Sequence, residues 1–202
     1  MPLFIYRHAL LICLLLVTGC APIVVAPTYQ PNATTTLLLQ ENKAGKVDVG
    51  LFNSSMDDLA NPRRLFNNHT FISPYNDSFA DYIATALRME LGQAGCFNQQ
   101  APIVVSGTLL ANSLNISPSF WGFDDAWEAG MTVDFVIRSN NRTIFNKRVT
   151  KSHKWEYTHV GGIPKAIQEY GTMVQLLVRD LVGDPEFIAA TKRNSSVAPE
   201  SR

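Results

Sequence analysis

An uninterrupted apolar run lies near the N-terminus, at residues 9–17. It determines which part of this chain is available to form the folded domain. A basic residue, Arg7, precedes the run, and the small residues Thr18 and Gly19 follow it. Because a helix needs about 20 apolar residues to cross a bilayer, this run is too short for a transmembrane segment. Its length and flanks are typical of a secretory signal peptide. We therefore expect residues 1–19 to be removed and the fold to be built from the rest.

The run ends in Val17-Thr18-Gly19-Cys20, which resembles the lipobox of bacterial lipoproteins. In a lipobox, small residues precede an obligatory cysteine whose thiol receives diacylglycerol. The resemblance implies that Cys20 becomes the acylated N-terminus, held almost permanently because each buried CH₂ contributes ~0.8 kcal/mol. The following residue is Ala21 and not Asp, which implies export to the outer membrane by the sorting rule of enteric bacteria. We expect a lipid-anchored protein on the periplasmic face of that membrane.

The use of cysteine agrees with this interpretation. Cys13 leaves with the signal peptide and Cys20 is acylated, so Cys96 alone remains and cannot form an intramolecular disulfide. Cys96 directly follows the predicted end of a helix, and we interpret it as a small buried apolar residue.

The sequence predicts that two segments at the ends of the mature chain are unstructured. Residues 20–35 contain three prolines and no helical period, which predicts a tether that reaches at most about 50–65 Å at ~3.3 Å per residue. Residues 192–202 are polar and aperiodic, which predicts a disordered tail. A single periplasmic α+β domain is expected over residues 36–191.

Within that domain the apolar periodicity predicts both strands and helices. The clearest helix is residues 79–95, because Phe79, Ile83, Leu87 and Leu91 repeat every four residues. A second helix begins near Pro164 and stops at Gly183-Asp184-Pro185, before a short closing segment. The predicted strands are residues 36–40, 46–53, 102–115, 131–139 and 143–157.

The last two strands are separated by Asn140-Asn141-Arg142. Asn tolerates positive φ, so a tight antiparallel hairpin is expected there. One face of an antiparallel sheet can bury the apolar stripes of both helices. The sequence therefore predicts an α+β two-layer sandwich, an antiparallel sheet with two helices packed on one face.

Composition and motifs exclude several classes of function. Lys and Arg total 17 and equal Asp plus Glu, and the pI is near 6.9, so nucleic-acid binding is not expected. No histidine or cysteine cluster has the spacing of a metal site, and no nucleophile, base and orienting residue form a pattern. We predict a protein that is not an enzyme and holds no metal or cofactor.

The one unusual segment is residues 117–130, SPSFWGFDDAWEAG, which contains Phe120, Trp121, Phe123 and Trp127. A connection between two strands is ordinarily polar. The aromatics could fold onto the sheet as a small core, or form an exposed patch that docks a partner, since aromatic residues dominate interface hot spots. Membrane insertion is a third alternative, opposed by the acidic residues among them.

The combination of a lipobox, a Pro-rich tether and this order of elements resembles the YajG-type lipoprotein family of Gram-negative envelopes. The resemblance is carried by the helix ending in GQAG, the strand after Pro102, the Asn140-Asn141 hairpin and the closing RDLVGDPEFIAA. Related layouts occur in auxiliary lipoproteins of lipid transporters and in activators of peptidoglycan synthases. The resemblance implies residence in the envelope more than a mechanism.

Two functions follow as hypotheses. The first is a structural or accessory interaction module that binds an envelope protein from its membrane anchor. The second is a carrier of a lipid or small apolar ligand, such as an auxiliary lipoprotein of a transport system. A deep apolar cavity between sheet and helices would favour the carrier, and a filled core would favour the interaction module.

Replacing Cys20 by Ser should abolish lipid attachment and release the protein from the membrane fraction, because the acyl chains supply the anchor. Metabolic labelling with palmitate and fractionation after a high-salt wash measure both effects. A Cys20→Ser protein that stays in the washed membranes would show that the lipobox assignment is wrong.

Overall fold

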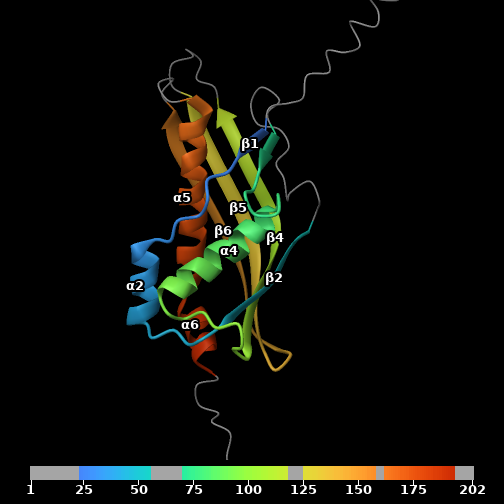
Figure 1. The fold of residues 1–202 in the computed structure, drawn as a ribbon, viewed down its shortest axis with the longest axis vertical. Coiled ribbons are helices and arrows are strands. Elements are labelled where there is room, and N and C mark those ends of the chain that lie inside the picture. The colour runs from blue at the N-terminus through green and yellow to red at the C-terminus, as the bar shows by residue number, and fades with distance from the viewer. Residues whose placement is uncertain (1–22, 56–69, 118–124, 158–161, 194–202) are drawn as a thin grey trace, which may run out of the picture.

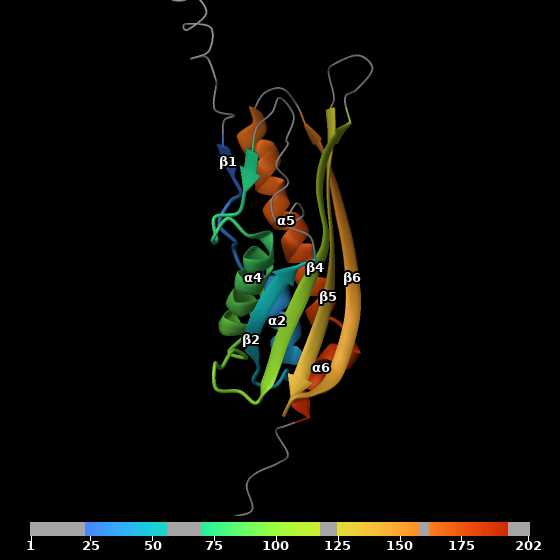
Figure 2. The ribbon, with the colours of Figure 1, turned by 90° about the vertical axis from the view of Figure 1, so that its right-hand side faces the viewer.

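The computed structural model describes residues 23–55, 70–117, 125–157 and 162–193, and these form a sheet covered on one face by helices (Figures 1 and 2). The four-stranded sheet has the order β2-β4-β5-β6. Its strands are β2 (Asp48–Ser54), β4 (Ile103–Ser117), β5 (Asp125–Ser139) and β6 (Arg142–Tyr157). Helix α4 (Phe79–Gln93) contacts β2 and β4, and α5 (Gly162–Val182) contacts β5 and β6. The predicted α+β two-layer architecture is confirmed.

The long strands β4, β5 and β6 form an antiparallel meander, as predicted. Asn140 and Asn141 connect β5 to β6 with φ angles of 49° and 64°. Positive φ at both central residues is what a tight hairpin turn with the twist of the flanking strands requires. The prediction of this hairpin is confirmed.

One strand pairing differs from the predicted antiparallel sheet. Strand β2 pairs with β4 in parallel, with Asp48 opposite Val104 and Asn53 opposite Thr108. The reason is that α4 lies between these strands in the chain and carries it back to the starting end of the sheet, which makes the returning strand parallel. The sheet is therefore mixed.

The predicted strand 36–40 is also wrong, because these residues lie in helix α2 (Ala33–Glu41). The Asn32 side chain accepts a hydrogen bond from the backbone N–H of Thr34 and begins the helix. The threonines suggested a strand, but Thr36 and Leu39 are buried at helical spacing against α4 and α5. Tertiary packing outweighs the weak β propensity of the threonines here.

The predicted tether is packed onto the domain from residue 23 onward. Strand β1 (Ile23–Val25) pairs in parallel with β3 (Thr70–Ile72), and neither strand was predicted. Ala26 and Tyr29 are buried. Prolines exclude a helix but do not prevent an extended segment from pairing. The described part of the fold therefore begins at residue 23, and Ala21 and Pro22 lie between it and Cys20 in the sequence.

Helix α4 forms as its periodicity predicts. Ser78 caps its N-terminus by accepting a hydrogen bond from the backbone N–H of Asp81, and Gly95 follows its end with φ of +73°. The four residues of the predicted stripe are all fully buried: Phe79, Ile83, Leu87 and Leu91.

Helix α5 buries its predicted stripe in the same way, and it is followed by α6 (Pro185–Lys192). Asp184 caps α6 by accepting from the backbone N–H groups of Glu186 and Phe187. The Phe187 ring packs edge-on against Phe145 of β6, with centroids 5.9 Å apart. These contacts join the end of the chain to the sheet.

Substituting Leu87 by Ala should lower the free energy of unfolding by about 2–5 kcal/mol, because it removes a fully buried aliphatic side chain between α4 and the sheet. A denaturant titration measures the loss. A change below about 0.5 kcal/mol, as expected of a surface site, would mean that this face of α4 is not packed as described.

Candidate functional site

The segment that joins the predicted lipid anchor to the domain, residues 23–32, crosses the helical layer; we call it the N-terminal strap. At its centre Tyr29 donates a hydrogen bond from its hydroxyl to Oε1 of Glu90 at 2.6 Å. The backbone N–H of Asn32 donates to the same oxygen at 2.8 Å. Glu90 lies on α4 and is completely buried. The buried carboxyl group of Glu90 thus holds the strap at two points.

The protonation of Glu90 is shifted by these surroundings. Burial raises the pKa of the Glu90 carboxyl above its ordinary value of 4.5, although the hydrogen bonds from Tyr29 and Asn32 oppose this. Burial and the hydrogen bond to Glu90 raise the pKa of the Tyr29 hydroxyl as well. Oε2 of Glu90 has no hydrogen-bond partner among the described residues. An unpaired oxygen in a dry site favours the protonated carboxyl.

Further hydrogen bonds fix the strap along its length. The hydroxyl of Tyr82 donates to the carbonyl of Pro27 at 2.8 Å, and the amide of Gln175 donates to the carbonyl of Gln30 at 2.7 Å. The backbone N–H of Tyr29 donates to the hydroxyl of Tyr75 at 3.0 Å. Side chains from α4, α5 and the turn before α4 therefore satisfy the strap's polar backbone groups.

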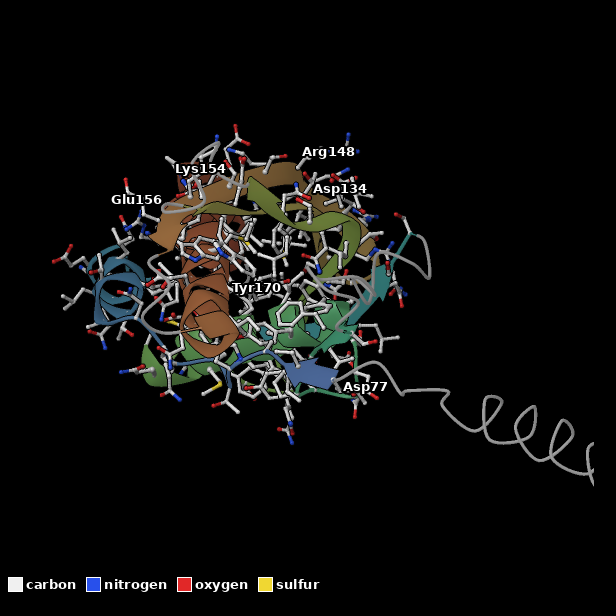
Figure 3. The ribbon with its side chains drawn as sticks, turned by 90° about the horizontal axis from the view of Figure 1, so that it is seen from above. Asp77, Asp134, Arg148, Lys154, Glu156 and Tyr170 are labelled. Carbon is white, nitrogen blue, oxygen red and sulfur yellow. The ribbon has the colours of Figure 1, made fainter. Side chains whose placement is uncertain are left out.

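Beneath the strap lies a cluster of aromatic rings centred on Tyr170 of α5. The Tyr170 ring packs against Phe71, Phe79 and Tyr82 with centroid distances of 5.1 to 6.1 Å. Its hydroxyl donates to Oδ1 of Asn112 on the sheet at 2.8 Å. Figure 3 places Tyr170 between the helical layer and the sheet. This cluster fills the region in which a carrier would need a cavity.

The beginning of the strap borders an open apolar groove. Its volume is about 450 Å³, and the described residues that line it come from the strap and α5: Ile23, Val24, Val25, Pro27, Ile167 and Gln168. The side chains of Ile23 and Val25 are 65% and 50% exposed. None of the lining residues that the structure describes is charged. The groove is a surface feature and not an enclosed cavity between the two layers.

The structure assigns one of the four aromatic candidates to the core. Trp127 lies in β5, not in a loop, and is only 3% exposed. It stacks on Trp155 of β6 with centroids 6.3 Å apart, and Trp155 in turn stacks on His153. Trp127 therefore belongs to a small aromatic core on the sheet, the first of the alternatives given above, and its ring is not available to bind a partner. Phe120, Trp121 and Phe123 lie outside the described residues, as does Cys20.

The other chemically interesting residues have structural partners. Nε2 of His153 lies 3.2 Å from Oε2 of Glu169, and Lys151 and Lys147 pair with Asp180 and Asp184. These three side-chain pairs join β6 to α5 and to the cap of α6. In the described part of the chain, no three potential metal-ligating side chains come together.

Cys96 is buried, and burial raises the pKa of its thiol. Its sulfur contacts the carbonyl oxygens of Ala44 and Ala94. A nucleophilic cysteine needs a lowered pKa and access to a substrate. Cys96 therefore has the structural character that the sequence predicted.

Sequence reasoning missed Glu90 and the strap. The signal was present, because Glu90 lies four residues after Ala86 and three after Leu87, on the apolar face of α4. A lone acidic residue on such a face requires a buried polar partner. That partner, Tyr29, lies 61 positions away in a segment without periodicity, so it could not be identified from the pattern.

The comparisons with known proteins bear on the fold alone. No family model matches the sequence, and no curated protein does. Among solved structures, protein XCC0632 from Xanthomonas campestris, of family DUF330, has a TM-score of 0.54 and 9% identity, covering 87% of this chain and 99% of that one. This likeness shows a shared fold.

Two further neighbours are less similar. A minor lipoprotein from Acinetobacter baumannii has a TM-score of 0.37 and 12% identity, covering 74% of this chain and 93% of its own. Protein CT253 from Chlamydia trachomatis has a TM-score of 0.35 and 14% identity, covering 72% and 97%. Membership of the YajG-type family stays a prediction. Among the described residues no helix is long and apolar enough to cross a membrane.

Substituting Glu90 by Gln should flatten the dependence of stability on pH. Because the pKa of Glu90 is raised on folding, the folded state retains a proton that the unfolded chain releases above its ordinary value of 4.5. Stability should therefore fall as pH rises through the window between the two pKa values. The Gln variant, which keeps the acceptor for Tyr29 and Asn32, should lack this fall. Thermal melts from acidic to neutral pH measure it.

Tyr29→Phe is the matched control, because it removes one hydrogen bond to Glu90 and leaves the carboxyl. It should cost about 1–3 kcal/mol and retain the fall with pH. Identical pH profiles for the natural protein and the Gln variant would contradict the assignment of a raised pKa to Glu90.

Proposed function

We propose that this chain is a lipoprotein of the outer membrane, anchored through Cys20, and that it serves as an accessory interaction module of a cell-envelope complex. The lipid anchor is inferred from one observation, the sequence Val17-Thr18-Gly19-Cys20 at the end of a short apolar run. The domain would lie on the periplasmic face, and its partner would be another envelope protein.

The packing of the domain supports an interaction module over a carrier. The space between sheet and helices is occupied by fully buried side chains, among them Phe71, Phe79, Phe135 and Tyr170. Small-molecule carriers ordinarily present a concave apolar pocket that covers most of the ligand. Here the interior that such a ligand would occupy is filled with protein.

The carrier remains the second candidate, and the apolar groove beside β1 is the observation that favours it. Its volume of about 450 Å³ lies at the lower end of the range for ligand pockets. Its open position on the surface, however, would leave a bound lipid only partly enclosed by protein. We therefore rank the carrier below the interaction module.

The proposal includes no catalytic step. Cys96 contacts backbone oxygens, and His153 faces Glu169 and the ring of Trp155. Neither arrangement places a nucleophile beside a base. The partner-binding candidates are Phe120, Trp121 and Phe123, which follow β4 directly and precede β5.

Substituting Trp121 by Ala should weaken partner binding and leave the domain stable. A hot-spot Trp contributes about 2 kcal/mol or more to an interface, whereas a surface change alters stability by only about 0.5 kcal/mol. Crosslinking in intact cells followed by affinity pulldown of the lipoprotein measures binding, and thermal melts of the purified protein measure stability.

Trp127→Ala is the matched control, since Trp127 is a buried Trp of the same aromatic segment. It should lower stability by about 3–5 kcal/mol. If Trp121→Ala lowers stability as much as Trp127→Ala, Trp121 belongs to the core and the docking hypothesis is wrong. Unchanged crosslinks and an unchanged melt for Trp121→Ala would move the carrier ahead of the interaction module.

A further inference from the structure

We propose that the end of the domain formed by β1 and the apolar groove lies directly on the lipid bilayer, with Ile23 and Val25 in contact with the membrane interface. This inference rests on the lipid anchor of the proposed function. It adds the orientation of the domain and the surface through which the domain touches lipid.

The first argument is the length of chain between the anchor and the folded body. Two residues, Ala21 and Pro22, separate Cys20 from the first residue of β1. Three residue steps span at most about 10–11 Å even when fully extended. A cysteine whose acyl chains are embedded in the bilayer therefore keeps the first residue of β1 within about 10–11 Å of the anchor point at the membrane interface.

The second argument is that β1 cannot swing away from the body. It pairs with β3 over all three of its residues, and the backbone N–H of Ala26 donates to the carbonyl of Ile72 at 2.8 Å. Beyond it, Tyr82 and Glu90 hold the strap through Pro27 and Tyr29. The link from Cys20 to β1 is short, and β1 is fixed to the rest of the domain. The end of the domain that carries β1 must therefore face the membrane.

The third argument is the chemistry of the surface at this end. Four large apolar side chains in the described part of the chain are strongly exposed, and two of them, Ile23 and Val25, lie on the three-residue strand β1. Single exposed apolar residues are ordinary, but two on one short strand form a patch, and the described residues of the groove beside them carry no charge. From Cys20 to Val25 the sequence is apolar without interruption. Lipid is an occupant that matches this chemistry.

Figures 1 and 2 show the geometry that follows. β1 and the start of α5 lie at one end of the long axis, and α6 and the β5–β6 turn lie at the other. Figure 3 views the molecule from the end that we propose to face the membrane. Helix α2, which carries the exposed Leu37, lies away from that end in both side views.

The test uses the full acylated protein in vesicles of phosphatidylethanolamine and phosphatidylglycerol. Cys96 is replaced by Ala, and a nitrobenzoxadiazole label is attached at Val25→Cys. The matched control is Leu37→Cys, because Leu37 and Val25 are similarly exposed aliphatic residues, at 54% and 50%. Doxyl groups on the lipid acyl chains quench a label in the membrane, and iodide quenches a label in water.

We expect doxyl lipids to remove about half or more of the fluorescence at position 25, because an interfacial side chain lies ~5–10 Å into the headgroup and acyl boundary. Iodide should have little effect there. The label at position 37 should show the reverse pattern. A second label at Ile23→Cys should behave like the one at position 25, and thermal melts verify that each variant is folded.

Equal iodide quenching at positions 25 and 37, without a response to doxyl lipids, in protein that floats with the vesicles would overturn the membrane contact and leave the anchor intact. Protein that does not float with the vesicles would overturn the anchor, and the proposed function and this inference with it. A photocrosslinker at Val25 that captures protein instead of lipid in intact cells would also overturn the proposal.

Discussion

The buried carboxyl group of Glu90 holds together the part of this molecule on which the rest of its geometry depends. Oε1 of Glu90 accepts from the side chain of Tyr29 and from the backbone of Asn32, the residue that caps α2. The same oxygen therefore fixes the strap over α4 and the point where α2 begins. Hydrogen bonds to a buried acceptor are worth more than those at the surface, and an unpaired buried carboxyl is costly. The path of residues 23–41 is specified by this pairing more than by local propensity.

Three side-chain pairs between β6 and the last two helices determine how these elements lie relative to one another. Three residues on one face of β6 each pair with an acidic residue beyond the strand. The pairs are Lys147 with Asp184, Lys151 with Asp180, and His153 with Glu169. Each pair is partly exposed, so each contributes little to stability by itself. Together they match the spacing of the strand to that of the helix and define how far α5 lies along the sheet. Apolar packing supplies the energy, and these pairs supply the register.

Elements with strong local signals could be predicted from the sequence. The stripe of α4, the Asn140-Asn141 turn and the long strands each carry a period or a turn residue that requires one structure. Helix α2 could not be predicted, because its burial comes from neighbours that are distant in sequence. β1 and β3 could not be predicted either, since a three-residue strand has no period of its own. The mixed sheet followed from the crossover through α4, which could have been deduced from the predicted order of elements.

For the candidate site, the sequence predicted residue types and motifs but not where those residues lie in the fold. Cys20 was predicted as the acylated residue from a motif that needs no fold, but the proposed closeness of the domain to the membrane required knowing that β1 pairs with β3. Trp127 belonged to an aromatic segment whose residues could not be sorted by pattern, and its place in β5 made it a core residue. Sorting such residues requires the strand register, here the pairing of Trp127 with Trp155.

The orientation proposed for β1 has a consequence for where a partner can bind. A strand of 15 residues such as β5 is roughly 50 Å long at ~3.3 Å per residue, so it would carry the far end of the sheet well away from the bilayer. The outer face of that sheet bears polar pairs, among them Arg148 with Asp134 and Thr150 with Thr132, and Figure 3 places Asp134 and Arg148 on the side away from the helices. A short anchor cannot turn this face toward the membrane. This outer face therefore stays accessible from the side without displacement of lipid.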